Sequence, residues 1–396
     1  MELFEPANLG PARLRNRLVK AATFEGRTPR GAVTDELVEF HRRHATGGVG
    51  ATTVAYCAVS PEGRTYRDQI VLDDDAVPGL RRLTDAVHGE GAAAFVQLGH
   101  AGTFANARVT RHPAIGPSRA FSPLGMSLAR PASIDDLARI RGAFGAAARR
   151  AVEADFDGVE VHLGHGYLLS QFLSPATNRR RDQYGGSAEA RARFPREVLR
   201  AVREAVGDHA AVTAKLNMLD GYRRGLDVDD ALVAARGIDQ DGTVDALQLT
   251  AGSTSRTPMF LIRGGVPIRD LIDQQPSTIQ RAGMRLVGRR LMVESPFEEA
   301  FLLPYARRFL DEVSTPLMLL GGVTRPETAR SALDEGFAFV AMARALLYEP
   351  DLPQRWRAGD TAPSGCDHGN RCVVEMQRGG TRCPIAPGDP WSTASV

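Results

Sequence analysis

Eight short apolar segments alternate with helical segments along the chain, and this rhythm restricts the fold more than any other feature. The segments cover residues 17–22, 50–57, 93–99, 158–162, 211–216, 246–252, 316–322 and 339–345. They are continuously apolar, which is typical of parallel strands buried on both faces. Apolar residues at helical spacing lie between most of them, for example over residues 134–155, 187–206 and 326–335. The pattern predicts an α/β fold, a (β/α)8 TIM barrel. A doubly wound sheet ranks second, because no Gly-x-Gly-x-x-Gly turn follows a strand.

Two segments do not follow the rhythm. Residues 256–298 separate the sixth and seventh predicted strands and are rich in Arg, Gly and Pro. In a barrel they form an enlarged loop on the catalytic face, either a lid or substrate wall, or else a surface insertion or subunit contact. The stretch after Pro353 carries three of the four cysteines. We therefore expect a barrel over residues 1–353 and a short cysteine-bearing C-terminal tail over 354–396.

Composition narrows the class of function. The 396 residues include 49 Lys and Arg against 47 Asp and Glu, a net charge of +2. This balance argues against a dedicated nucleic-acid binder, and no apolar stretch has the length of a membrane span. The N-terminal residues do not resemble a signal peptide, and four cysteines are too few for a disulfide scaffold, so we expect a cytoplasmic protein. We expect a small-molecule substrate, no nucleic-acid or membrane partner, and allow for a homo-oligomer.

A glycine pair follows the seventh predicted strand, and an alanine and an arginine follow the eighth. Glycine lets the backbone approach a ligand closely. Backbone N–H groups after strands seven and eight bind a phosphate in many barrels, and an arginine can add a charged fork. The candidate phosphate-binding residues are Gly321, Gly322, Ala343 and Arg344. The alternative is a tight turn with a surface arginine.

The fourth predicted strand ends in a His-x-x-His-x-Tyr group formed by His162, His165 and Tyr167. Three readings are open: a metal site, although no third ligand follows at the usual spacing; two structural histidines; or two donors that converge on one substrate oxygen. In the third reading the histidines stabilise developing enolate charge and the phenol donates a proton. Lys215, at the end of the fifth strand, could form a Schiff base, face an anionic cofactor, or simply be exposed to water.

The segment GVEVHLGHGYLLSQFLSPATNRRRDQYGGSAEARARF, residues 158–194, closely resembles the old yellow enzyme family of FMN-dependent NAD(P)H:flavin oxidoreductases. The similarity spans nearly the whole barrel and includes LFEPANLGPARLRNRLVKAAT, VSPEGR, VQLGHAG, LLGGV and VAMARALLYEPDLP, in that order. The resemblance implies FMN in the barrel mouth. It implies that the flavin is contacted by Ala21, Ala22, Thr23, Gln97 and Lys215, and its phosphate by Gly321, Gly322, Ala343 and Arg344. It also implies that His162 and His165 bind the electron-withdrawing group of a substrate and that Tyr167 is the proton donor.

Several positions depart from the family pattern. Ala343 stands where the family usually has glycine, and Phe24 stands where many members have a Thr or Cys that bonds the flavin C4 carbonyl. Thr23 is adjacent and could take that role. Tyr56 and Glu25 also make the expected substrate pocket, together with Phe24, different from that of the best-known members.

The tail contains Cys366, Cys372 and Cys383. This spacing resembles the cysteine cluster that follows the barrel in the dienoyl-CoA reductase and amine dehydrogenase branch, where four cysteines hold a four-iron cluster. Gly369 stands in place of the second cysteine. Because such a cluster normally needs four ligands, we expect no iron–sulfur cluster and no metal, although His368 could complete a site.

We therefore expect hydride transfer from NAD(P)H through FMN to an activated alkene such as an enone. The first alternative is FMN-dependent oxidation of a secondary or N-methyl amine. Others are a Schiff-base lyase that uses Lys215 and a non-catalytic flavin-binding subunit.

Overall fold

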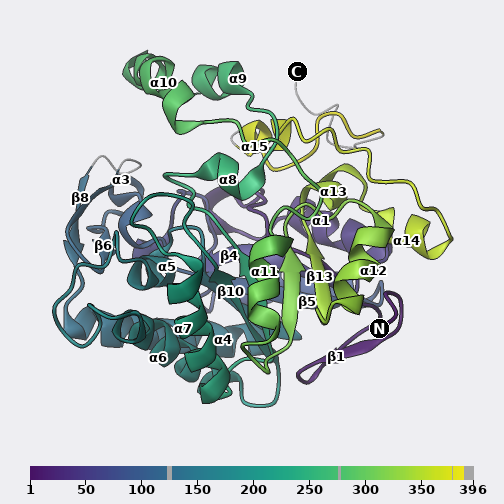
Figure 1. Ribbon diagram of the computed structural model, residues 1–396, viewed down its shortest axis with the longest axis horizontal. Coiled ribbons are helices and arrows are strands. Elements are labelled where there is room, and N and C mark those ends of the chain that lie inside the picture. The colour runs from purple at the N-terminus through teal and green to yellow at the C-terminus, as the bar shows by residue number, and fades with distance from the viewer. Residues whose placement is uncertain (123–126, 275–277, 377, 388–396) are drawn as a thin grey trace.

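The computed structural model describes residues 1–122, 127–274, 278–376 and 378–387. They form a closed barrel of eight strands in which every neighbouring pair is parallel (Figure 1). Around the barrel the strands are β3 Leu18–Lys20, β4 Ala51–Ala58, β5 Ala93–Gly99, β9 Gly158–Leu163, β10 Ala211–Asn217, β11 Ala246–Thr250, β12 Leu317–Leu320 and β13 Phe339–Met342. Each predicted apolar segment overlaps one of these strands, so the TIM-barrel prediction is confirmed.

Helices pack around the outside of the barrel. The longer ones are α1 Asp35–Thr46, α2 Val77–His88, α4 Ile134–Glu153, α6 Ala188–Val206, α7 Val228–Asp241, α11 Leu303–Leu310 and α12 Pro326–Asp334. The three predicted helices match α4, α6 and α12 closely. Their starts follow from capping: the Ser133 side chain accepts the Asp136 N–H in a capping box, and the Ser187 side chain accepts the Ala190 N–H.

Strand register decides which polar side chains meet. Gln97 on β5 lies beside Glu160 on β9, and Lys215 on β10 lies beside His162 on β9. Because side chains two apart on a strand share a face, Glu160 and His162 point the same way. The parallel register therefore brings four polar side chains from three strands together at one end of the barrel.

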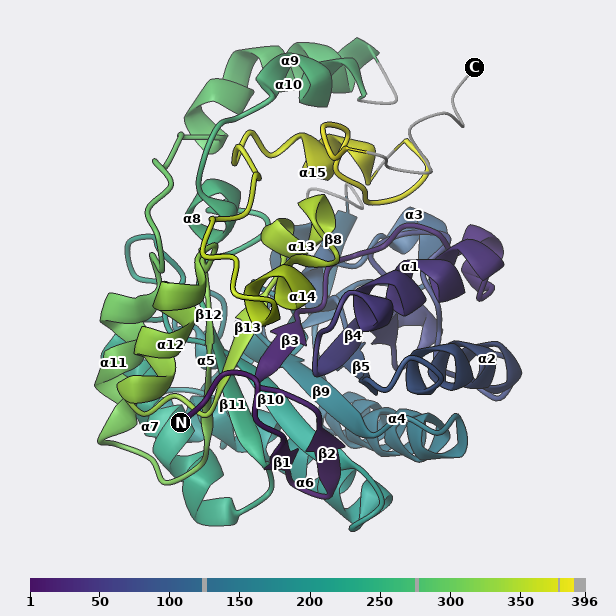
Figure 2. The same cartoon turned by 90° about the vertical axis from the view of Figure 1, so that its right-hand side faces the viewer.

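The enlarged loop and the tail meet above that end. The loop contains α8 Pro258–Ile262, α9 Ile268–Asp273 and α10 Thr278–Leu291, and α9 and α10 extend beyond the rest of the molecule (Figures 1 and 2). In both views the tail helix α15, Arg371–Glu375, lies between these two helices and the barrel. The ring of Phe297 stacks on that of His368 with centroids 3.4 Å apart, and the Gly265 N–H donates to the His368 carbonyl at 3.0 Å.

Smaller elements complete the chain. The hairpin of β1 Ala7–Leu9 and β2 Ala12–Leu14 precedes the barrel, and a three-stranded sheet of β6 Ile115–Gly116, β7 Ala120–Ser122 and β8 Ser127–Pro131 follows β5. The short helices are α3 Ala107–Thr110, α5 Leu168–Leu173, α13 Arg344–Tyr348 and α14 Leu352–Arg357, with single 3-10 turns at Pro29–Gly31, Pro61–Gly63 and Gly102–Phe104. Among the helices of the described residues, none is both long and apolar enough to cross a membrane.

Candidate active site

A cavity of about 320 Å³ lies at the carboxyl ends of the barrel strands. All eight strands or the residues just after them contribute to its wall, together with the enlarged loop and the tail. The residues predicted from sequence that line it are Ala21, Ala22, Thr23, Phe24, Tyr56, Gln97, His162, His165, Tyr167, Lys215, Gly321, Gly322, Ala343 and Arg344. The structure thus brings together side chains that lie more than 300 residues apart in the sequence.

His162 and His165 stand edge to face in this cavity, with ring centroids 4.9 Å apart. His162 Nδ1 accepts the Gly164 N–H at 3.2 Å, which leaves the ring proton on Nε2. His165 has a positive φ of 60°, and its Nε2 lies 2.8 Å from Thr250 Oγ1. Burial lowers the pKa of His162 well below its ordinary value and that of His165 to about 3, with further lowering by Lys215. Both rings are therefore neutral hydrogen-bond donors at neutral pH.

Tyr167 lies against the same pair. Its ring centroid is 5.0 Å from that of His162 and 5.1 Å from that of Tyr56. Burial, and then the neighbouring Tyr56, raise the pKa of Tyr167 well above its ordinary value, so the phenol keeps its proton. The Tyr56 hydroxyl is engaged elsewhere, because it lies 2.5 Å from Thr65 Oγ1 and donates to the Gly63 carbonyl at 3.2 Å. Of these two phenols, Tyr167 is the better candidate proton donor.

Lys215 is held by a carboxylate that the sequence analysis did not single out. Its Nζ lies 3.0 Å from Glu160 Oε1, and Gln97 Nε2 donates to the same oxygen at 2.6 Å. All three side chains are buried. Lys215 is therefore engaged in a buried ion pair with Glu160, and this geometry argues against the Schiff-base alternative. A glutamate two residues before His162 on a buried strand was the available signal.

Glu25 differs from its expected place in the substrate pocket. It does not line the cavity but points into the protein behind it, 4% exposed. Its Oε1 accepts the Ala55 N–H at 2.8 Å and lies 3.4 Å from His41 Nε2. The neighbouring Phe24 lines the cavity instead and stacks on Tyr66, with ring centroids 4.6 Å apart. Consecutive residues in this extended segment point to opposite sides, so only one of the two can face the cavity.

The end of the cavity formed after β12 and β13 is suited to a phosphate. Gly321 and Gly322 have positive φ values of 116° and 81°. A Cβ on Gly322 would lie 2.6 Å from Phe301 Cδ1 and 2.9 Å from the Glu298 carbonyl oxygen. No hydrogen bond between described residues uses the backbone N–H of Gly322 or of Arg344, so both are available to a ligand. Ala343 has a φ of −120° and a ψ of −86°, so it does not adopt the left-handed conformation that favours glycine.

These donors fit FMN. The backbone N–H groups of Gly322 and Arg344 and the Arg344 guanidinium lie at one end of the cavity. Gln97 and Lys215 line the same cavity from β5 and β10. Arg344 is oriented by two hydrogen bonds of 2.7 Å from Nη1, to the Arg263 carbonyl and to Asn370 Oδ1. Its remaining donors can pair with a phosphate bidentately.

The tail contributes to the cavity wall, which sequence reasoning did not anticipate. The tail residues that line the cavity are His368, Cys372, Val373, Met376 and Thr381. The Thr381 N–H donates to the Glu25 carbonyl at 2.7 Å, which ties the tail to the segment after β3. Burial raises the pKa of Cys372 to about 12, so it is a thiol. Within the described ranges no three His, Cys, Asp or Glu side chains are grouped to hold a metal ion.

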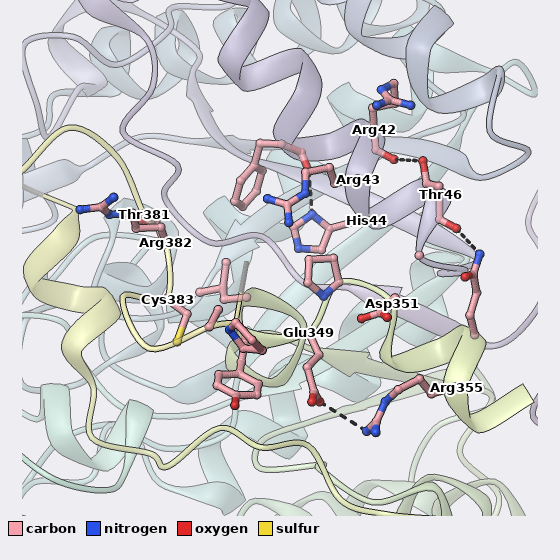
Figure 3. A pocket seen from close by; sticks show the side chains of 18 residues that line it. Arg42, Arg43, His44, Thr46, Glu349, Asp351, Arg355, Thr381, Arg382 and Cys383 are labelled. Carbon is pink, nitrogen blue, oxygen red and sulfur yellow. Dashed lines mark hydrogen bonds and ion pairs between the residues drawn. The ribbon is translucent and has the colours of Figure 1, made fainter. Parts of the chain in front are cut away.

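A second hollow, of about 470 Å³, lies between the end of α1, the α13–α14 junction and the tail (Figure 3). Its basic side chains are largely satisfied within the protein: Arg42 pairs with Glu39 at 2.7 Å, and Arg355 with Asp360 at 2.8 Å. The ring of His44 is held between the Phe40 and Leu346 carbonyls. This hollow contains none of the predicted site residues, so the candidate active site is the smaller cavity at the barrel mouth.

Comparison with known proteins agrees with this assignment. Residues 2–253 match the NADH:flavin oxidoreductase / NADH oxidase family. The chain is 50% identical over 383 residues to the 4,4'-dithiodibutanoate disulfide reductase of Rhodococcus erythropolis, with 97% of this chain and 94% of that protein covered. It is 36% identical over 358 residues to a metal reductase of Desulforamulus reducens, covering 90% of this chain but only 49% of that longer protein. Its fold matches the old yellow enzyme homologue of Zymomonas mobilis with a TM-score of 0.70 at 24% identity, over 97% and 98% of the two chains. The chain therefore belongs to the NADH:flavin oxidoreductase / NADH oxidase family, the old yellow enzyme family of FMN-dependent oxidoreductases.

Proposed function

We propose that the chain reduces an activated alkene, such as an enone, with NAD(P)H as the electron source. The observation that carries this proposal is the convergence of two neutral imidazoles and one protonated phenol in a single cavity. When bound, FMN supplies the two-electron chemistry that connects NAD(P)H to the acceptor. The FMN would be held by Gln97 and Lys215 and, at its phosphate, by Gly322 and Arg344.

The protein's own residues have separate tasks in this reaction. His162 and His165 donate to the carbonyl oxygen of the acceptor, which polarises the conjugated double bond and stabilises the negative charge that develops there. Tyr167 delivers a proton to the carbon next to that carbonyl. The Thr250 hydroxyl fixes the ring of His165, and the aromatic wall of Tyr56, Tyr66 and Phe24 keeps water out.

The test is alkene reduction by two histidine variants. Each of His162→Ala and His165→Ala should lower kcat for 2-cyclohexenone by about 10²–10³-fold, the usual effect of one lost oxyanion donor. Flavin reduction by NAD(P)H in the absence of enone should change much less. His88→Gln is the control, because His88 lies outside the cavity in a pair with Asp157. Enone kinetics that match wild type in both cavity variants would contradict the proposal.

A small organic disulfide is the second candidate acceptor. The 50% identity to a 4,4'-dithiodibutanoate disulfide reductase over nearly the full length of both chains favours it. In this reaction the disulfide and NAD(P)H, with one proton, give two thiols and NAD(P)+. The leaving groups are thiolates, whose conjugate thiols have a pKa of about 8.5, so their departure needs little help from an acid.

Tyr167→Phe separates the two candidates. The variant should slow reduction of 2-cyclohexenone by about 10²–10⁴-fold, because a carbon centre needs the proton donor. It should affect reduction of 4,4'-dithiodibutanoate little. Comparing kcat/KM for both acceptors in one preparation shows which the protein prefers. A chain that reduces only the disulfide would replace the alkene assignment.

We also propose that the protein acts in the cytoplasm. NAD(P)H is available there, and thiols stay reduced; the four cysteines Cys57, Cys366, Cys372 and Cys383 are free thiols in the structure. Secretion of the native protein from its host, shown by fractionation, would contradict this location.

A further inference from the structure

The chain uses lysine at two positions only. Of its 49 basic Lys and Arg residues, Lys20 and Lys215 are lysines and the other 47 are arginines. Both lysines are buried, with exposed fractions of 0% and 2%, and each lies near a buried glutamate. An ammonium group is a compact point charge, whereas a guanidinium is a wide planar fork. In a chain that otherwise uses arginine, the lysines mark positions where the compact charge matters. Lys215 belongs to the site already described, but Lys20 does not line the cavity.

Lys20 reaches the cavity through a threonine. Its Nζ donates to Thr23 Oγ1 at 2.9 Å, and Thr23 lines the cavity. The other neighbours of the ammonium group are Glu25 Oε1 at 3.8 Å and the face of the Phe40 ring at 4.9 Å. Because a hydroxyl carries one hydrogen, a Thr23 oxygen that accepts from Lys20 directs its own hydrogen to another acceptor.

We infer that Lys20 is a positioning residue for the cofactor, which holds the Thr23 hydroxyl as a hydrogen-bond donor toward FMN and supplies a second buried positive charge near it. Thr23 precedes Phe24, which provides no hydrogen-bond donor of its own to the cavity. This inference rests on FMN occupying the cavity, but not on which acceptor the enzyme reduces.

The charges around Lys20 explain how it affects the cofactor. Glu25 lies on the segment that follows β3, Lys215 and Glu160 act on Lys20 from β10 and β9, and His41 and His44 face it from α1. Burial lowers the pKa of His41 and of His44, so both rings are neutral. The two lysines and two glutamates therefore balance to zero charge. Burial also lowers the pKa of Lys20 to about 8, against the opposing effect of Glu25, which leaves it mostly charged at neutral pH.

Removing the Lys20 charge leaves this buried group of side chains with a net negative charge. FMN gains negative charge on reduction, so the oxidised form becomes relatively favoured and the midpoint potential falls. An effect of about tenfold on the ratio of binding constants of reduced and oxidised FMN corresponds to about 30 mV for two electrons.

The test is the two-electron midpoint potential of bound FMN, measured by equilibration with a reference dye without any acceptor substrate. Lys20→Met should lower the potential by about 30 mV, a tenfold change in the binding ratio. The double variant Lys20→Met with Glu25→Gln removes both charges and replaces the single variant if that one does not fold. It should lower the potential less than Lys20→Met alone, because only the orientation of the Thr23 hydroxyl is lost. Thr23→Val should also lower it, and its effect should not add fully to that of Lys20→Met, since the two act through one hydrogen bond. Arg308→Met, which breaks a surface pair with Asp229, is the matched control and should leave the potential unchanged.

A potential equal to wild type in both Lys20 variants would overturn the inference, even if the variants were less stable. Fully additive effects of Lys20→Met and Thr23→Val would show that Lys20 does not act through Thr23. Because the measurement uses no alkene or disulfide, its result is independent of the proposed reaction.

Lysine-selective isotope labelling gives a second readout that a purely structural role would not change. Only two side-chain ammonium signals exist, one from Lys20 and one from Lys215, and Lys20→Met assigns them. Both signals should shift when the bound FMN is reduced by dithionite. A Lys20 signal that stays fixed while the Lys215 signal moves would contradict the inference.

Discussion

Replacing Glu160 with glutamine tests the electrostatic core of the site. Glu160 Oε1 lies 3.0 Å from Lys215 Nζ and accepts from Gln97 Nε2 at 2.6 Å, and both charged side chains are 2% exposed. Glutamine has nearly the same shape and retains one acceptor oxygen. Glu160→Gln therefore removes the charge with little change in packing, and it leaves the Lys215 ammonium buried without a counter-charge.

The size of the effect follows from this distance. Two unit charges about 3 Å apart interact by about 5 kcal/mol at the effective dielectric constant of about 20 that suits protein sites. Breaking a buried ion pair by removing one partner typically costs about 3–5 kcal/mol. Since glutamine keeps a hydrogen bond to Lys215, we expect a loss near the lower end, about 3 kcal/mol of unfolding free energy.

Urea unfolding of the FMN-free protein measures this loss. The control is Glu197→Gln on α6, a half-buried carboxylate that pairs with Arg141 at 3.3 Å outside the barrel, for which about 0–1 kcal/mol is expected. The midpoint potential of bound FMN should rise in Glu160→Gln, opposite in sign to the Lys20 variants, because the uncompensated Lys215 charge favours the reduced cofactor. A stability loss no larger than the control, together with an unchanged potential, would refute the electrostatic reasoning.

Three further predictions address other parts of the structure. Gly322→Ala should weaken FMN binding by at least about tenfold, because a positive φ costs a non-glycine residue about 1–2 kcal/mol, and the new Cβ would lie 2.6 Å from Phe301. Fluorescence titration of the apoprotein with FMN measures the Kd, and an unchanged Kd would count against the phosphate site. Thr250→Val should lower kcat for 2-cyclohexenone while leaving the affinity for FMN unchanged, because the hydroxyl orients His165 and not the cofactor; a loss of FMN measured by absorbance would contradict this role. Acid should destabilise the protein below pH 6.5, because the pKa of His165 falls to about 3 on folding, so the unfolded chain binds the proton first and stability declines as pH falls, by up to about 1.4 kcal/mol per unit. Urea unfolding at pH 7 and pH 5 should show a smaller loss in His165→Asn than in wild type, and equal losses would show that His165 does not contribute.

The amino-acid sequence was sufficient to predict the barrel and most residues of the site. Continuous apolar runs separated by helices require parallel strands buried on both faces, and eight of them close into a barrel. The carboxyl ends of parallel strands meet at one edge, so polar residues that end different strands, such as Gln97, His162 and Lys215, converge whatever their separation in the chain. Local patterns therefore specify both the fold and the position of these side chains.

Only the tertiary structure decided which of the neighbouring residues Phe24 and Glu25 faces the cavity, and which side chains form ion pairs and hydrogen bonds with one another. Glu25 and Phe24 are adjacent, and Glu25 turns away from the cavity toward the Ala55 N–H on β4 and His41 on α1, partners that the local sequence does not encode. The Glu160–Lys215 pair depends on the register between β9 and β10. The contacts of Thr381 with Glu25 and of His368 with Phe297 join segments far apart along the chain, and no periodicity in the sequence reports such contacts. Strand pattern fixes where a side chain can lie, but its partners are set by long-range packing that forms only when the whole chain has folded.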